Sequence, residues 1–315
     1  MKNFRRFALL STLATYTLIF IGGLVRVSGA GLGCPDWPKC FGRWFPPTSI
    51  SQLPPDINPS QFNFTLAWIE YFNRLVGVTI GILIFITAVL AIKNYRKVNK
   101  ILIPSLAALV LVAYQGWQGG QVVESQLKPL FVSIHMVLAL IIVSLLIFVT
   151  QQSYYLEKPE ADRGAIFPRR TRLWMSLLWI VGIIQVILGT QVREGLEVLR
   201  QRFPLLSGAE IREYIGPVNY VHAILGIVIA AVTILAGYTI LMKSRNLSGL
   251  IRESVWGMIV LIVAQLIVGL VLVVAGLPSL LQLFHLWIAS LFIGVIFVLY
   301  SAFRRQTGGD HAIGA

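Results

Sequence analysis

Eight apolar runs, each about as long as a membrane-crossing helix, dominate this sequence and leave few folds open to it. A helix of roughly 20 apolar residues crosses the hydrocarbon core of a bilayer. Hydrophobic residues make up 57% of the chain and charged residues only 12%, which is more apolar surface than a soluble core could bury. The sequence therefore predicts an all-α integral membrane protein with eight transmembrane helices. They are expected at residues 7–27, 64–92, 100–123, 131–152, 173–194, 216–242, 254–276 and 279–303.

The positive charge of the chain lies in short clusters between the apolar runs. The formal net charge is +13, and 17 of the 26 lysines and arginines fall at the two termini and in alternate loops. This distribution indicates membrane orientation and attraction to anionic lipid, so the bilayer is the expected partner and nucleic acid is not. By the positive-inside rule, both termini are predicted to be cytoplasmic.

The first apolar run is expected to be a retained helix. Basic residues precede it, but no A-x-A-like cleavage site of a secretory signal follows it. The sequence also shows no amphipathic leader rich in arginine and serine, which favours a bacterial plasma membrane over an organelle. The protein is thus predicted to be a multi-pass protein of that membrane.

The two halves of the chain repeat each other, with polar as well as small residues in register. The offset between paired residues is 149 or 150 in three cases and 167 in the fourth, and a longer first outer loop explains the difference. An even number of spans returns the chain to its starting side, so the fold is predicted to be two parallel, pseudo-symmetric four-helix bundles. Chance similarity among small residues of membrane helices is the alternative. The pairs are Asn73 with His222, Gln115-x-x-x-Gly119 with Gln265-x-x-x-Gly269, His135 with His285, and Gly22-x-x-x-Arg26 with Gly189-x-x-x-Arg193.

This repeat divides the chain into four segments. An N-terminal bundle is predicted over residues 1–152 and a C-terminal bundle over 173–305, joined by a cytoplasmic linker over 153–172. A polar tail over 306–315 contains His311, for which a solvated position without a role is expected.

The other three histidines lie within apolar runs, where an ionisable side chain is costly and marks a functional candidate. His222 and His285 lie near the starts of two helices that both begin at the outer face. Two imidazoles at similar depth in one bundle suit axial ligation of a haem iron, whereas zinc would need three or four ligands at one site. A structural hydrogen bond from each histidine to a neighbouring helix is the alternative.

The first half offers only one such imidazole, His135, because Asn73 occupies the position of its partner. Glu70 lies one turn before Asn73 and shares its helix face with Arg74. Glu70 is therefore predicted to be an acid or base beside a reactive centre, with a purely structural pair to Arg74 as the alternative. The second bundle is interpreted as a structural or electron-transfer haem site, and the first as the reaction chamber.

Taken together, these residues resemble the haem A synthase family, and the resemblance covers the membrane region from residue 7 to residue 303. It is carried by GGLVRVSGAGLGCPDWP at 22–38, E-x-x-N-R at 70–74, His135, and the pair His222 and His285.

The resemblance implies an oxidoreductase that converts haem O to haem A. The C8 methyl group of the porphyrin becomes a formyl group, and the product is inserted into haem-copper terminal oxidases. The resemblance also implies haem b between His222 and His285, a substrate haem O near His135, and a catalytic part for Glu70. A haem O synthase and subunits of the terminal oxidase are the protein partners it suggests.

The chain departs from the family pattern at two places. The family usually has histidine where this chain has Asn73, so His135 is predicted to be the sole protein ligand of the substrate haem. Many relatives also carry a second cysteine pair in the outer loop of the second half, whereas residues 195–215 contain no cysteine.

Three arginines, Arg26, Arg74 and Arg193, lie close to the outer ends of predicted helices. Their guanidinium groups are candidates for bidentate hydrogen bonds to haem propionates. The alternative is that they extend toward lipid phosphate.

The two cysteines, Cys34 and Cys40, lie in the first outer loop, in an oxidising compartment if the predicted orientation holds. Pro35 and Pro38 bend the chain between them, so a disulfide is plausible. Both a structural staple over the first bundle and a redox relay are compatible with this pair.

Two other classes of protein compete with the enzyme. A membrane b-type cytochrome for quinol-linked electron transfer would use the same pair of histidines, but it would not explain Glu70 beside a missing ligand. A transporter built from parallel repeats would typically have helices broken near the middle of the bilayer, where this chain has little proline.

Overall fold

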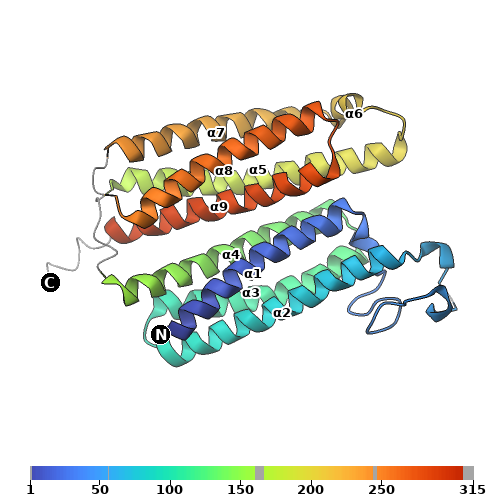
Figure 1. The fold of residues 1–315 in the computed structure, drawn as a ribbon, viewed down its shortest axis with the longest axis horizontal. Coiled ribbons are helices and arrows are strands. Elements are labelled where there is room, and N and C mark those ends of the chain that lie inside the picture. Colours follow the sequence, from blue (N-terminus) through green and yellow to red (C-terminus); the bar gives the residue numbers. More distant parts are fainter. Residues whose placement is uncertain (1, 56, 160–166, 244–246, 308–315) are drawn as a thin grey trace. The chain divides into compact units, whose positions relative to one another are not determined.

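We describe a computed structural model of the chain, which covers residues 2–55, 57–159, 167–243 and 247–307. In these residues the protein is helical, and eight of its helices are long and apolar enough to cross a membrane, as predicted (Figure 1). The helices are α1 Lys2–Val27, α2 Phe64–Tyr95, α3 Asn99–Glu124, α4 Pro129–Glu157, α5 Arg169–Arg202, α6 Gly208–Ile215, α7 Pro217–Lys243, α8 Gly249–Val274 and α9 Ser279–Thr307.

Some of the long helices begin where a polar side chain caps their first free N–H groups. Asn63 accepts a hydrogen bond from the backbone of Leu66 at the start of α2, and Ser248 accepts one from Ile251 at the start of α8. Between the caps the helices are apolar on all sides, and many large side chains such as Phe85 remain on the surface. Lipid is the solvent that such a surface requires.

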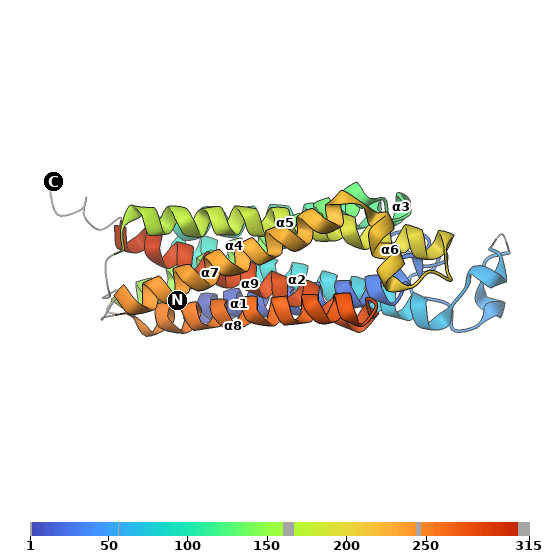
Figure 2. The ribbon, with the colours of Figure 1, turned by 90° about the horizontal axis from the view of Figure 1, so that it is seen from above.

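Contacts divide the chain into two units within α4, the first covering Lys2–Leu146 and the second beginning at Ile147. In the first unit α2 packs against both α1 and α3, and in the second α5 and α8 each pack against α7 and α9 (Figure 2). Each unit has its own apolar core, which is compatible with the predicted pair of bundles. The first core contains Ile80, Ile84, Ala108, Ile142 and Leu146, and the second is centred on Met175, Leu178, Val255, Met258, Ile296 and Leu299.

The connection between α1 and α2 is the long loop of the first unit, and it extends past the ends of both helices (Figure 1). It contains three short 3-10 turns, at Ala30–Leu32, Ile50–Gln52 and Pro59–Gln61. In the second unit the corresponding connection is shorter and contains α6, a helix that the apolar pattern did not predict.

Two local features of the second unit extend beyond the apolar runs. Helix α5 continues to Arg202 rather than ending near residue 194, and Arg200 on its last turns donates hydrogen bonds to the carbonyls of Gly276 and Leu277. Helix α6 is fixed at its start by Ser207 and Glu210, whose side chains and backbone groups bond reciprocally. These hydrogen bonds hold the pKa of Glu210 below its usual value.

Part of the predicted linker, residues 160–166, lies outside the described residues, as does the end of the predicted tail with His311.

Candidate functional site

The candidate residues of the first unit lie near the same end of its helices as the long loop between α1 and α2. His135 lies six residues after α4 begins, and Asn73 lies nine residues after α2 begins. Gly22 and Gly119 lie five residues before the ends of α1 and α3. Because neighbouring helices of the bundle run in opposite directions, these four positions share one level.

A glycine on the preceding helix faces each of these polar residues. A Cβ atom added to Gly119 would lie 3.4 Å from Cε1 of His135, and one added to Gly22 would lie 3.9 Å from Oδ1 of Asn73. The absence of a side chain at Gly119 lets the imidazole lie close to the backbone of α3.

The same arrangement occurs in the second unit with histidine at both positions. A Cβ atom on Gly189 of α5 would lie 3.1 Å from Cε1 of His222, and one on Gly269 of α8 would lie 3.3 Å from Cε1 of His285. These four glycines are 167 and 150 residues apart in sequence, like the repeat pairs to which they belong. The sequence showed them as repeat markers, but their contact with the imidazoles appears only in the structure.

His222 and His285 face each other across the second unit. Their ring centroids are 6.4 Å apart, and their planes are inclined by 65°. Two imidazoles that each bind the same metal ion at about 2 Å would have centroids on the order of 6 Å apart, so these two residues could hold one metal ion between them. The Nδ1 atoms of both rings are buried without a hydrogen-bond partner in the described part of the chain.

Glutamines hold the helices that carry these histidines. Nε2 of Gln185 donates to the carbonyl of His222 at 2.7 Å, and Nε2 of Gln115 donates to the carbonyl of His135 at 2.9 Å. Gln118, which the sequence did not single out, lies 2.6 Å from Nδ1 of His135 through its Oε1 atom. The sequence signal for Gln118 was the spacing of polar residues on α3, where glutamines lie at 115, 118 and 121 along one side of an apolar helix.

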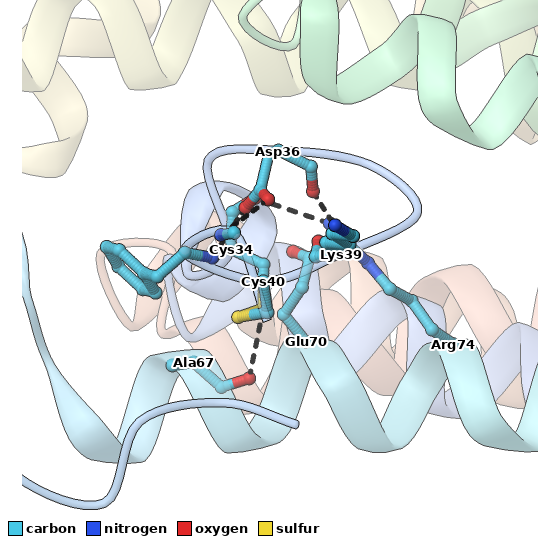
Figure 3. Close-up of a disulfide and its surroundings, with 9 residues drawn as sticks. Cys34, Asp36, Lys39, Cys40, Ala67, Glu70 and Arg74 are labelled. Atoms are coloured by element: carbon cyan, nitrogen blue, oxygen red, sulfur yellow. Dashed lines mark hydrogen bonds and ion pairs between the residues drawn. A yellow bond between two sulfur atoms is a disulfide. The ribbon is translucent and has the colours of Figure 1, made fainter. Parts of the chain in front are cut away.

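Glu70 is buried on α2 and forms an ion pair with Arg74 one turn later (Figure 3). Nη2 and Nε of Arg74 lie 3.0 and 3.2 Å from Oε1 of Glu70. The other carboxylate oxygen, Oε2, is buried without a hydrogen-bond partner among the described residues. One oxygen of Glu70 is thus held in place by Arg74, while the other has no partner among the described residues.

Arg74 also binds the loop between the two cysteines (Figure 3). Its Nη1 atom donates to the carbonyls of Asp36 and Lys39 at 2.9 and 2.8 Å, and its Nη2 atom donates to the carbonyl of Cys34 at 3.3 Å. The guanidinium group therefore joins this loop to Glu70. Arg74 was a candidate for binding a haem propionate. In the structure its N–H groups instead donate hydrogen bonds to oxygen atoms of the protein.

The loop itself is closed by a disulfide between Cys34 and Cys40, whose Cα atoms are 4.7 Å apart. Both cysteines are fully buried. The carboxylate of Asp36 accepts hydrogen bonds from the backbone N–H groups of Phe41 and Gly42, which have positive φ angles of 54° and 74°. The loop is therefore an ordered structure with its own hydrogen bonds.

The loop lies directly on the ends of α2 and α3. A Cβ atom on Gly33 would lie 2.3 Å from the carbonyl oxygen of Leu66, so only glycine allows this approach to α2. A Cβ atom on Gly120 would lie 2.9 Å from the ring of Trp37. Trp37 thus contacts α3 one residue after Gly119, the glycine that faces His135.

The other two arginines considered for propionates have protein contacts in their own units. Nη1 of Arg26 lies 3.7 Å from the sulfur of Met136, the residue after His135. Arg193 donates to Gln282 through Nη1, and its Nε atom lies 3.9 Å from Glu197. Their role toward a propionate stays a prediction.

Fold and site together define a class of protein: a multi-pass, all-α membrane protein that carries polar and ionisable side chains, histidines among them, within its helical units. Comparison with known proteins identifies the family. The chain matches the COX15-CtaA family of cytochrome oxidase assembly proteins over residues 5–297, and it belongs to that family.

Curated relatives carry the name haem A synthase. The protein from Rickettsia prowazekii is 26% identical over 96% of this chain and 98% of its own length. The protein from Alkalihalophilus pseudofirmus is 25% identical over 97% of each chain. A relative from Shewanella oneidensis is 31% identical over a shorter region, 42% of this chain and 40% of its own. These similarities confirm the predicted family and indicate an oxidoreductase of haem A biosynthesis.

Proposed function

We propose that this protein is a haem A synthase that oxidises the C8 methyl group of haem O to a formyl group for use in haem-copper terminal oxidases. Family membership supports the general reaction. One observation supports a different role for each unit: the two units differ in the polar side chains at matching positions. The second has two facing imidazoles, whereas the first has one imidazole and a buried carboxylate with one oxygen free.

In this proposal the second unit holds haem b through His222 and His285. The spacing of the two rings and their buried, unpartnered Nδ1 atoms fit this group, and the facing glycines make room for the rings. A haem held by these two imidazoles would supply electron transfer. The two histidines fix its position, and the apolar helices around them exclude water.

The first unit takes haem O as its substrate, with His135 as the sole protein ligand. Asn73 lies at the level of the missing second histidine and leaves that side of the substrate open. Glu70 lies one turn from Asn73, and its Oε2 atom is the position at which this chain can hold or accept a proton. Arg74 holds Oε1 through Nε and Nη2, which leaves the other oxygen for this exchange.

The disulfide loop serves as the cover of this reaction chamber. It lies on the ends of α2 and α3, and Arg74 connects it to Glu70. Excluding water strengthens electrostatic interactions around a reacting group and limits side reactions. We propose a structural role for the disulfide in this cover, since Arg74 binds loop carbonyls rather than either sulfur.

The proposal places the protein in a bacterial plasma membrane with both termini in the cytoplasm. The eight apolar helices and the distribution of basic residues support this orientation. The histidine level and the disulfide loop then face the outer side. A haem O synthase and subunits of a haem-copper oxidase are the proposed protein partners.

Expression in a host that makes haem O but no haem A tests the proposal. The porphyrins are extracted and identified by chromatography and mass spectrometry. We expect hydroxylated or formylated haem in cells with the protein and none in cells without it. A protein that carries haem B alone and leaves haem O unchanged would instead be a b-type cytochrome, and a colourless protein would be neither.

A further inference from the structure

Gln118 binds the ring of His135, and the hydrogen-bonding capacity of the two side chains fixes how. Nε2 of Gln118 lies 2.7 Å from the carbonyl oxygen of Phe131, and a carbonyl oxygen can only accept. The amide nitrogen must therefore face Phe131, which turns Oε1 toward His135. The Oε1 atom in turn can only accept, so Nδ1 of His135, at 2.6 Å, must carry a hydrogen and donate it.

This arrangement selects one form of a neutral imidazole. A neutral histidine has one protonated nitrogen, and the other carries the lone pair that a metal ion needs. With the hydrogen fixed on Nδ1, the lone pair lies on Nε2. Gln118 is only 1% exposed, so water does not compete for its oxygen.

We propose that Gln118 is a positioning residue that fixes His135 as the Nδ1-protonated tautomer and presents Nε2 as the iron ligand of the substrate haem. A hydrogen bond to the second nitrogen of a ligand histidine fixes the ring and raises its basicity. The tautomer follows from the hydrogen bonds alone, and only its use as an iron ligand rests on the proposed function.

The second unit supports this assignment by lacking the same contact. The residue that matches Gln118 at the offset of 150 is Val268, which has no hydrogen-bonding side chain. Nδ1 of His285 is buried without a partner in the described residues. The neighbouring glutamine is kept in both units, as Gln115 and Gln265. Both units therefore have the glutamine at the position of Gln115. Only the first unit, in which His135 has no second histidine opposite it, has the glutamine that binds the ring, Gln118.

The difference has a physical reason. In a site with two axial histidines, the iron itself holds both rings. A single histidine ligand that must take up a substrate and release it needs another group to fix its ring. Gln118 supplies this constraint from α3, because its two contacts, with the ring of His135 and with the carbonyl of Phe131, lie on one turn of α4.

The tautomer can be measured without haem O. The full-length protein is labelled with 15N-histidine and purified in lipid nanodiscs from cells that make no haem O, and its 15N NMR spectrum is recorded. The chain has four histidines, and the His135 signals are those lost in His135→Gln. We expect a protonated Nδ1 and an unprotonated Nε2, and Gln118→Leu should change the ratio of the two tautomers roughly fivefold or more.

Gln115→Leu is the matched control, since it removes a glutamine one turn away that binds the backbone of His135 rather than its ring. It should leave the tautomer as in the wild type. A wild-type His135 protonated on Nε2, or a ratio unchanged by Gln118→Leu, would overturn the proposal.

A second measurement tests the use of the tautomer. Ferrous haem O is added, and the iron–histidine stretching band is recorded by resonance Raman spectroscopy. We expect Gln118→Leu to lower its frequency and Gln118→Glu to raise it, because the hydrogen bond controls the basicity of the ligand. Identical frequencies in all three proteins would refute the positioning role. Failure of the wild type to bind haem O would contradict the proposed function, while the NMR result would still decide the tautomer.

Discussion

At the scale of single residues, the chemistry proposed for the first unit depends on one oxygen atom. The ion pair with Arg74 uses Oε1 of Glu70 and leaves Oε2 without a partner in the described chain. A pair that served only for stability would be expected to use both oxygens, because a buried unpartnered carboxylate oxygen is costly. The structural and functional interpretations of Glu70 are therefore separable by substitution.

Glu70→Gln should abolish product formation while the haem of the second unit is kept. Glutamine can still accept the hydrogen bond from Arg74 through its carbonyl oxygen, so the loop should stay in place, but it cannot exchange a proton as a carboxylate does. Extracted porphyrins report product, and the absorption spectrum reports bound haem. Formation of haem A at the wild-type rate would show that Glu70 is structural.

The glycines that face the histidines give a second prediction. Gly189→Ala would place a Cβ atom 3.1 Å from Cε1 of His222, so the ring must move. Such overpacking costs about 1–3 kcal/mol. We expect a weakened low-spin absorption spectrum and a lower thermal midpoint of haem release.

Gly257→Ala on α8 is the control for this substitution, because a Cβ atom there would meet nothing within 4 Å. It should leave the spectrum unchanged and, as a glycine in a helix, slightly raise stability. Equal effects of the two substitutions would mean that the contact with His222 does not position the ring.

At the scale of elements, the loop between α1 and α2 is fixed to α2 by contacts other than its disulfide, which joins two residues of the loop itself. Three of its carbonyl oxygens accept hydrogen bonds from Arg74, and Gly33 lies against the first turn of α2. An arginine can make these contacts together with the ion pair because it has five donors in one plane, whereas a lysine has three on one atom. The loop and Glu70 therefore depend on the same side chain.

Arg74→Lys should release the loop without removing the positive charge. We expect faster hydrogen exchange in residues 34–43, measured by mass spectrometry, and product formation reduced by about tenfold or more, since each lost charge-assisted hydrogen bond costs roughly 1.5–3 kcal/mol. The haem spectrum of the second unit should not change. Unaltered exchange in the loop would show that the disulfide alone maintains it.

At the scale of the whole molecule, the two units share one plan and differ in their polar residues. In each, a histidine or asparagine near the start of one helix faces a glycine near the end of another. The second unit completes this plan with two histidines, and the first replaces one of them with Asn73. The proposed division into an electron-transfer unit and a reaction unit follows from this difference.

Removing a histidine from either unit should therefore have different results. His222→Ala or His285→Ala should eliminate the low-spin spectrum of the bound cofactor, because one axial ligand is lost. His135→Ala should keep that spectrum but lose the binding of added haem O. Difference spectroscopy on the purified variants measures both, and loss of the low-spin spectrum in His135→Ala would contradict the division.

Much of the fold was predictable because a helix that contacts lipid must consist mostly of apolar residues, and this can be recognised in the sequence. A helix that crosses a bilayer must be apolar over about 20 residues, so all eight membrane helices could be placed from composition along the chain. The rule does not apply outside the bilayer. The extension of α5 to Arg202 and the short helix α6 depend on polar contacts and caps, and the apolar pattern did not show them.

The sequence by itself determined the number of membrane-crossing helices, the repeat, and the residues whose presence in an apolar helix requires a reason: Glu70, His135, His222 and His285. These follow from the cost of placing polar groups in lipid, which is a property of each residue and its neighbours along the chain. Only the tertiary structure decided which donors meet which acceptors. In the structure Arg74 binds the loop, Oε2 of Glu70 has no hydrogen-bond partner among the described residues, and Gln118 binds the ring of His135. Hydrogen bonds between helices depend on how each helix is rotated about its axis and how deep each residue lies, and hydropathy encodes neither.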